Sequence, residues 1–130
     1  MSPEAASYLE KAREDLEDAT KVAAIGLPKL AARCAYYAAF HAAEAFIVEK
    51  TGRIAKTHSG VRSELMRLAN EMTSVDRSLP KFLAKAYLFK EMSDYAVGPG
   101  IMLTPQDADA AIVEARRFID AISGFLSAAK

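Results

Sequence analysis

The stretch from Pro28 to Thr51 constrains the fold of this chain more than any other part of it. It is rich in alanine, the best helix former, and contains no glycine or proline after its first residue. Proline suits the first turn of a helix, and Gly52, directly after the stretch, is a typical helix stop. We therefore predict one long helix here, apolar enough to lie at the centre of a bundle.

Four further helices are predicted from apolar spacing and from their boundary residues. They cover about Pro3–Ala24, His58–Glu71, Leu79–Tyr95 and a last segment that begins at Thr104-Pro105-Gln106-Asp107 and includes Ala108–Phe125. Ser2 is expected to cap the first of them, and Thr104 with Asp107 to cap the last. The segment from Ala96 to Leu103, which holds Gly98-Pro99-Gly100, is expected to be a loop.

Apolar residues recur every three or four positions in these segments, which predicts one buried face on each helix. The expected inward residues are Leu9, Ala12, Leu16, Ala19 and Ala23; Val61, Leu65 and Leu68; Phe82, Ala86, Phe89 and Met92; and Ile112, Ala115, Ile119, Ile122 and Leu126. No strand signal competes with this pattern. The expected fold is all-α, an antiparallel bundle of four to five helices in a single domain over residues 1–130.

Composition excludes several classes of protein. Hydrophobic residues make up 52% and charged residues 26% of the chain, as in a globular protein and unlike a disordered one. The chain has a single cysteine, Cys34, which excludes an internal disulfide framework or a zinc finger and fits a reducing cytoplasm. We expect Cys34 itself to be a small core residue. We expect no signal peptide, because the N-terminus, Met1-Ser2-Pro3-Glu4, opens no basic and then apolar region, and no membrane span, because no apolar stretch approaches about 20 residues.

Charge is balanced overall, with 17 basic and 17 acidic residues, but it is uneven along the chain. Basic residues outnumber acidic ones between Lys50 and Lys90, and the remaining segments are correspondingly acidic. One interpretation is that this basic middle packs beside acidic first and last helices. The other is a surface for phosphate or RNA.

The long helix carries polar residues on its apolar side. At about 100° per residue, Arg33, Tyr37, Phe40, His41 and Glu44 share one arc. Buried charges need partners, so these groups form either an internal network or the wall of a cleft or dimer groove. A metal site is disfavoured, because the spacing of His41 and Glu44 reverses the usual di-iron order and the chain has only 2 histidines.

Two other positions are candidates for binding. Thr57 either caps the third helix or, with Lys56 and His58, helps to hold a phosphate at the exposed amides there. On the fourth helix, Lys90 and Asp94 are four residues apart, so they form either a plain ion pair or part of a site with the nearby Tyr87 and Tyr95. No glycine-rich phosphate motif and no Ser/His/Asp spacing is present.

Three segments together resemble HEPN-domain proteins, in particular a branch of small stand-alone proteins. Arg33–Glu44, RCAYYAAFHAAE, resembles the second-helix pattern RAYYAxFHAA of that branch. Lys56–Val61, KTHSGV, follows Gly52 and resembles its KTHxGV stretch, and Met92–Tyr95, MSDY, resembles its fourth-helix ADY element. The resemblance extends from about Tyr8 to Leu126.

The resemblance implies a helical bundle that forms homodimers in the cytoplasm and needs no metal or other cofactor. It also implies a toxin–antitoxin or defence module in which a nucleotidyltransferase is the partner and RNA or a nucleotide is contacted. The implied catalytic positions are Lys90, Asp94 and Tyr95. The implied RNA- or nucleotide-binding positions are Arg33, Tyr37, His41, Lys56 and His58.

The chain departs from the family pattern at the catalytic positions. Cleaving members have an arginine and a histidine on the fourth helix, where this chain has Lys90 and Tyr95. Tyrosine is a poor proton carrier near neutral pH, and lysine lacks the bidentate fork of arginine. A degenerate metal-independent ribonuclease, with His41 or His58 as a substitute, therefore stands beside a non-catalytic helical interaction module; a metal-dependent bundle enzyme is the third alternative.

Overall fold

We analysed a computed structural model that describes residues 1–72, 77–95 and 103–128. In these residues the chain forms five helices and no strand: α1 (Pro3–Ala24), α2 (Pro28–Thr51), α3 (His58–Glu71), α4 (Ser78–Tyr95) and α5 (Pro105–Ala128). The all-α prediction is therefore confirmed, with α4 beginning one residue earlier than expected. The loop predicted from Ala96 lies outside the described residues as far as position 102.

Local sequence explains where the helices begin and end. The Ser2 hydroxyl accepts a hydrogen bond from the Ala5 amide at 3.1 Å and so caps α1. At the start of α5, the Thr104 amide donates to Asp107 Oδ2 at 3.0 Å and the Asp107 amide donates to Thr104 Oγ1 at 3.1 Å, a reciprocal capping box. Gly52 ends α2 in the left-handed conformation, with φ of 70°.

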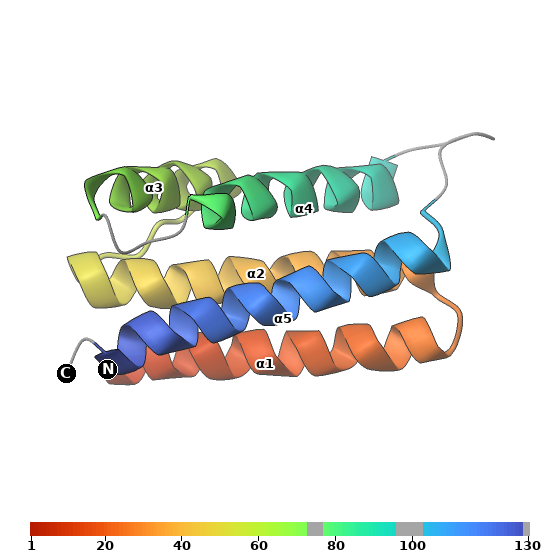
Figure 1. Ribbon diagram of the computed structural model, residues 1–130, viewed down its shortest axis with the longest axis horizontal. Helices are drawn as coiled ribbons and strands as arrows, with labels where there is room; N and C mark the ends of the chain where they lie inside the picture. Colours follow the sequence, from red (N-terminus) through yellow and green to blue (C-terminus); the bar gives the residue numbers. More distant parts are fainter. Residues whose placement is uncertain (73–76, 96–102, 129–130) are drawn as a thin grey trace.

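The long helix α2 is the centre of the bundle, as its sequence predicts. It contacts all four other helices. Figure 1 shows α1, α2 and α5 running side by side, with α3 and α4 following one another along the opposite side of α2 from α1. The alanines of α2 are buried, and their small side chains let the neighbouring helices approach closely.

The core contains most of the expected inward residues. The predicted stripes of α1, α3 and α5 are buried, except that Ala23 is only half-buried. The prediction for α4 is partly wrong, because Phe82 and Phe89 are half-buried and Met92 is 37% exposed. Ala86 is buried as predicted, and α4 also turns Leu79, Leu83 and Lys90 inward, because the fit of α4 against α2 decides which of its side chains are covered.

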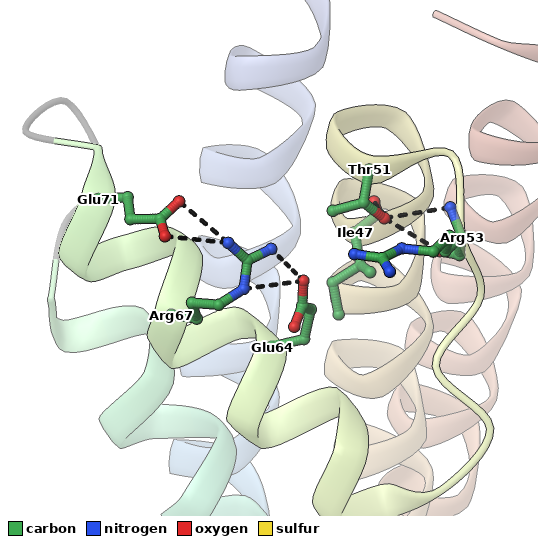
Figure 2. A network of polar contacts seen from close by, with 6 residues as sticks. All are labelled: Ile47, Thr51, Arg53, Glu64, Arg67 and Glu71. Carbon is green, nitrogen blue, oxygen red and sulfur yellow. Dashed lines mark hydrogen bonds and ion pairs between the residues drawn. The ribbon is translucent and has the colours of Figure 1, made fainter.

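Polar contacts on the outer surface of α3 neutralise part of the basic middle segment. Figure 2 shows Arg67 between Glu64 and Glu71, with Arg67 Nη1 3.0 Å from Glu71 Oε2. Beside it, the Thr51 hydroxyl donates to the Ile47 carbonyl at 2.8 Å and accepts from the Arg53 amide at 3.1 Å (Figure 2). These contacts stabilise helix ends and surfaces, so they do not mark a binding site.

Only one described ion pair joins the basic middle to the last helix, Lys85 to Glu114 at 4.0 Å. The interpretation in which acidic helices neutralise the basic middle therefore accounts for a small part of its charge. None of the helices in the described ranges has the length and apolar character that crossing a membrane requires.

Candidate functional site

The candidate site lies where α2, α3 and α4 meet. We call it the tyrosine–histidine cluster, and it consists of Tyr36, Tyr37, Phe40, His58, Arg62, Tyr87 and Lys90, with Arg33 and Asp94 at its margin. Each helix places its members on one face by a spacing of three or four residues. The cluster therefore exists only once the three helices are packed together.

A hydrogen bond between Tyr36 and His58 organises its buried end. The Tyr36 hydroxyl lies 2.5 Å from His58 Nδ1. Burial raises the pKa of Tyr36, so its hydroxyl keeps its proton, and which of the two groups donates depends on the tautomer of the histidine. Burial, with Lys90 and Arg62 as further causes, lowers the pKa of His58. The lowered pKa favours the neutral form of His58 near pH 7.

Arg62 covers the ring of Tyr87. Its guanidinium carbon is 4.0 Å from the ring centroid, a close cation–π contact. Arg62 Nη1 is buried and has no hydrogen-bond acceptor among the described residues. A hydrogen-bonding contact with Glu91 raises the pKa of the Tyr87 hydroxyl. The cluster thus holds a cationic donor whose hydrogen-bonding capacity is not filled by the described part of the chain.

Asp94 joins two cations at the margin of the cluster. Its carboxylate is 2.8 Å from Lys90 Nζ and 3.4 Å from Arg33 Nε. Lys90 is only 8% exposed, and its hydrogen bond with Asp94 is the main cause of its raised pKa. Arg33 also lies over the Tyr37 ring at 5.4 Å. The ion pair expected between Lys90 and Asp94 is present, and it extends to Arg33 on α2.

The structure divides the polar arc of α2 between two neighbours. Arg33 and Tyr37 face α4, whereas His41 faces α1, with Nδ1 2.7 Å from Glu44 Oε1 and Nε2 3.5 Å from Asp15 Oδ2. An arc about 100° wide on a central helix reaches two different helices, which is why these residues have different neighbours. His41 belongs to an internal network, and burial raises the pKa of Asp15 beside it.

Other predicted residues lie elsewhere. Lys56 is exposed in the connection between α2 and α3. Thr57 accepts a hydrogen bond from the Gly60 amide at 2.9 Å, so it caps α3 as the simpler interpretation predicts.

Tyr95 is the last residue of α4, and its side chain lies outside the described part of the chain. Cys34 is half-buried, and no described cluster of three or more potential ligands could hold a metal.

Sequence reasoning missed several members of these networks. Tyr36 was expected only as part of a motif, and Arg62 and Asp15 were not singled out. Arg62 follows His58 by four residues on one helix, so a search for shared helix faces could have found it. The contact between Asp15 and His41 joins two helices and has no local signal.

Comparisons with known proteins agree with this architecture. A UPF0332 protein of Archaeoglobus fulgidus is 35% identical over 89 residues, which are 68% of this chain and 70% of that protein. The crystal structure of TT1696 from Thermus thermophilus aligns with 95% of this chain and 98% of its own at a TM-score of 0.72, and its 24% identity makes this a likeness of fold alone. The profile of the HEPN domain matches residues 5–125. Since that match spans nearly all of the bundle, the chain belongs to the HEPN domain family.

Proposed function

We propose that this HEPN-domain protein contacts RNA or a nucleotide through the tyrosine–histidine cluster. The observation that supports the proposal is the close association of aromatic rings with cations. Tyr37 and Tyr87 are half-buried, and Arg33, Arg62 and Lys90 lie over or beside their rings. Bases stack on aromatic rings and guanidinium planes, and phosphates bind the cations beside them.

The polar contacts of the cluster suit an anionic ligand. Asp94 and Glu91 offset part of the charge of the three cations and hold Lys90 in place. The Arg62 guanidinium, held over the Tyr87 ring, adds a positive charge beside the aromatic rings. Arg33 contacts Asp94 through Nε. This nitrogen carries only one of the five N–H donors of the guanidinium.

The protonation states favour binding over cleavage. Metal-independent RNA cleavage needs one group to accept the 2′-hydroxyl proton and another to protonate the leaving oxygen. The Tyr36 hydroxyl occupies Nδ1 of His58 through a hydrogen bond, so this nitrogen is not a ready base. The raised pKa of Lys90 makes that residue a fixed cation and a poor acid. The ribonuclease role is thus the less supported form of the proposal.

The binding proposal is tested with a fluorescent single-stranded RNA and with a labelled ATP analogue, by anisotropy. Arg33→Ala is expected to weaken binding several-fold, because it removes a phosphate donor and a stacking partner of Tyr37. Arg116→Ala is the matched control, since Arg116 is an exposed arginine on the α1 side of α5. Equal affinities of the two variants would exclude the cluster as the binding site.

Cleavage is tested separately, in EDTA, with the intact protein, His58→Ala and Lys90→Ala. We expect no cleavage by the folded intact protein. Metal-independent cleavage that disappears in a folded His58→Ala variant would instead make the protein a ribonuclease that works without the arginine and histidine of the family pattern.

Membership of the HEPN family supports a wider proposal, in which the protein is part of a toxin–antitoxin or defence module with a nucleotidyltransferase partner. Co-expression with a nucleotidyltransferase encoded beside it, followed by co-purification, tests this pairing. A complex that survives gel filtration is expected. Separate elution of two folded proteins would argue against the pairing.

A homodimer is proposed as well, and the outer face of α4 supports an interaction role. Leu88 is 63% exposed and Met92 37% exposed, one turn apart on that face. The alanines of α2, in contrast, are buried within the bundle and offer no surface. Light scattering is expected to give a dimer mass that Leu88→Glu lowers and that Val113→Glu, at a 50% exposed position on α5, leaves unchanged. A monomer mass for the intact protein would contradict the proposal.

A further inference from the structure

A groove with a volume of about 510 Å³ lies between α4 and α5, away from the tyrosine–histidine cluster. Its floor is apolar, with Leu79 and Phe118 buried and Phe82 half-buried. The rings of Phe82 and Phe118 are 5.6 Å apart. Both helices pack against α2, as Figure 1 shows, and this packing fixes the two sides of the groove. Its volume is within the range of about 300 to 1,000 Å³ that is usual for ligand sites.

The rim of this groove is cationic. Lys81 and Lys85 line it from α4 and Arg117 lines it from α5, all exposed. Glu114 is the one acidic residue among those that line the groove, and it lies 4.0 Å from Lys85. Lys81 and Arg117 form no ion pair with another described residue. An occupant would therefore meet an apolar floor between positive edges, which favours apolar side chains flanked by carboxylates.

Two surfaces of this chain, the acidic helix α1 and the exposed apolar residues that follow it, do not match such an occupant. The acidic helix α1 buries Leu9 and Leu16 and exposes charged residues, so it has no apolar side chain to place on the floor. The exposed Ile25 and Leu27 lie next to Lys21 and Lys29, whose charge a cationic rim would repel. These two parts of a second copy are thus a poor fit for the groove.

We propose that the α4–α5 groove binds an acidic, amphipathic helical segment of a partner protein. One face of that segment places apolar side chains between Phe82 and Phe118, in the manner of a helix seated in a hydrophobic groove. Its aspartate or glutamate side chains pair with Lys81 and Arg117. This inference does not depend on RNA contact, because the groove and the tyrosine–histidine cluster share no residue.

Selection of phage-displayed peptides on the intact protein tests the proposal, with Arg117→Glu protein for counter-selection. Enriched peptides are then synthesised and titrated by fluorescence anisotropy, and amide shifts in NMR spectra map where they bind. Circular dichroism confirms that each variant is folded. Arg116→Glu is the matched control, because it makes the same charge change at the adjacent residue of α5, on the side that faces α1.

We expect acidic peptides with apolar residues three or four positions apart, and shifts concentrated on α4 and α5. Lys81→Glu and Arg117→Glu should each weaken binding about fivefold or more, Arg116→Glu should not, and high salt should weaken binding to the intact protein. Enrichment of peptides without acidic residues, or equal affinities for Arg117→Glu and Arg116→Glu, would overturn the proposal. The proposal would also be overturned if RNA were the only ligand that binds at the groove. It would be overturned as well if Arg117→Glu dissociated an oligomer of the protein, since a second copy of the chain would then occupy the groove.

Discussion

The Tyr36 hydroxyl lies 2.5 Å from Nδ1 of His58 and so joins the central helix α2 to the first turn of α3. Tyr36 is fully buried, and the His58 ring is also 4.6 Å from Phe40 and 5.8 Å from Tyr87, measured between ring centroids. This one polar contact therefore sets the orientation of the histidine within an aromatic environment. The first two predictions follow from it.

Tyr36→Phe is expected to lower the free energy of unfolding by about 1 kcal/mol, because it removes the hydrogen bond and leaves a ring nitrogen of His58 without its partner. Urea denaturation followed by circular dichroism measures the change. Tyr37→Phe removes the same hydroxyl from a half-buried neighbour and is expected to have a smaller effect. A larger loss in Tyr37→Phe than in Tyr36→Phe would contradict this account.

Stability is expected to fall as the pH is lowered through about 6.5, the usual pKa of histidine. Burial, with Lys90 and Arg62, lowers the pKa of His58 in the folded protein, so the unfolded chain takes up this proton at a higher pH. The contribution of His58 is complete above the unfolded pKa and is lost as the pH falls toward the folded one. NMR titration of the His58 ring, assigned with His41→Asn, measures the shift; a titration midpoint above 6.5 would contradict the prediction.

Asp94→Asn is expected to destabilise the protein by about 1 to 2 kcal/mol, because it removes the carboxylate that compensates the nearly buried Lys90. Lys90→Met keeps the bulk of the side chain and removes its charge. Combining it with Asp94→Asn should cost less than the sum of the two single changes. Additive losses in thermal or urea unfolding would show that the two residues are not coupled.

Thr104→Ala is expected to cost about 1 kcal/mol, since it removes half of the capping box that starts α5. Thr104→Ser keeps the hydroxyl and should retain most of the stability. The two unfolding free energies are compared in urea. A loss in the serine variant as large as that in the alanine variant would point to the methyl group of Thr104 and away from the cap.

Much of the fold could be predicted because its signals are local. Ser2, Thr57 and the pair Thr104 and Asp107 bond to amides within four residues, so their spacing alone places the helix starts. The alanine content of α2 likewise predicted a central position, because a helix without a polar face has to be surrounded. The rotation of α4 was not predictable in this way. Met92 is 37% exposed and Lys90 is buried, because the fit of α4 against α2 decides which of its side chains turn inward.

The candidate site shows the same division between local and long-range information. Residue types and spacing identified Arg33, Tyr37, His58, Lys90 and Asp94 without knowledge of any contact. Only the packed helices decided that these five residues meet and that His41 instead faces Asp15 on α1. Helix caps and apolar stripes depend on neighbours within a few residues, whereas a site built from three helices depends on the rotation of each about its own axis. That rotation is decided by the fit of side chains across the interfaces, which no single segment contains.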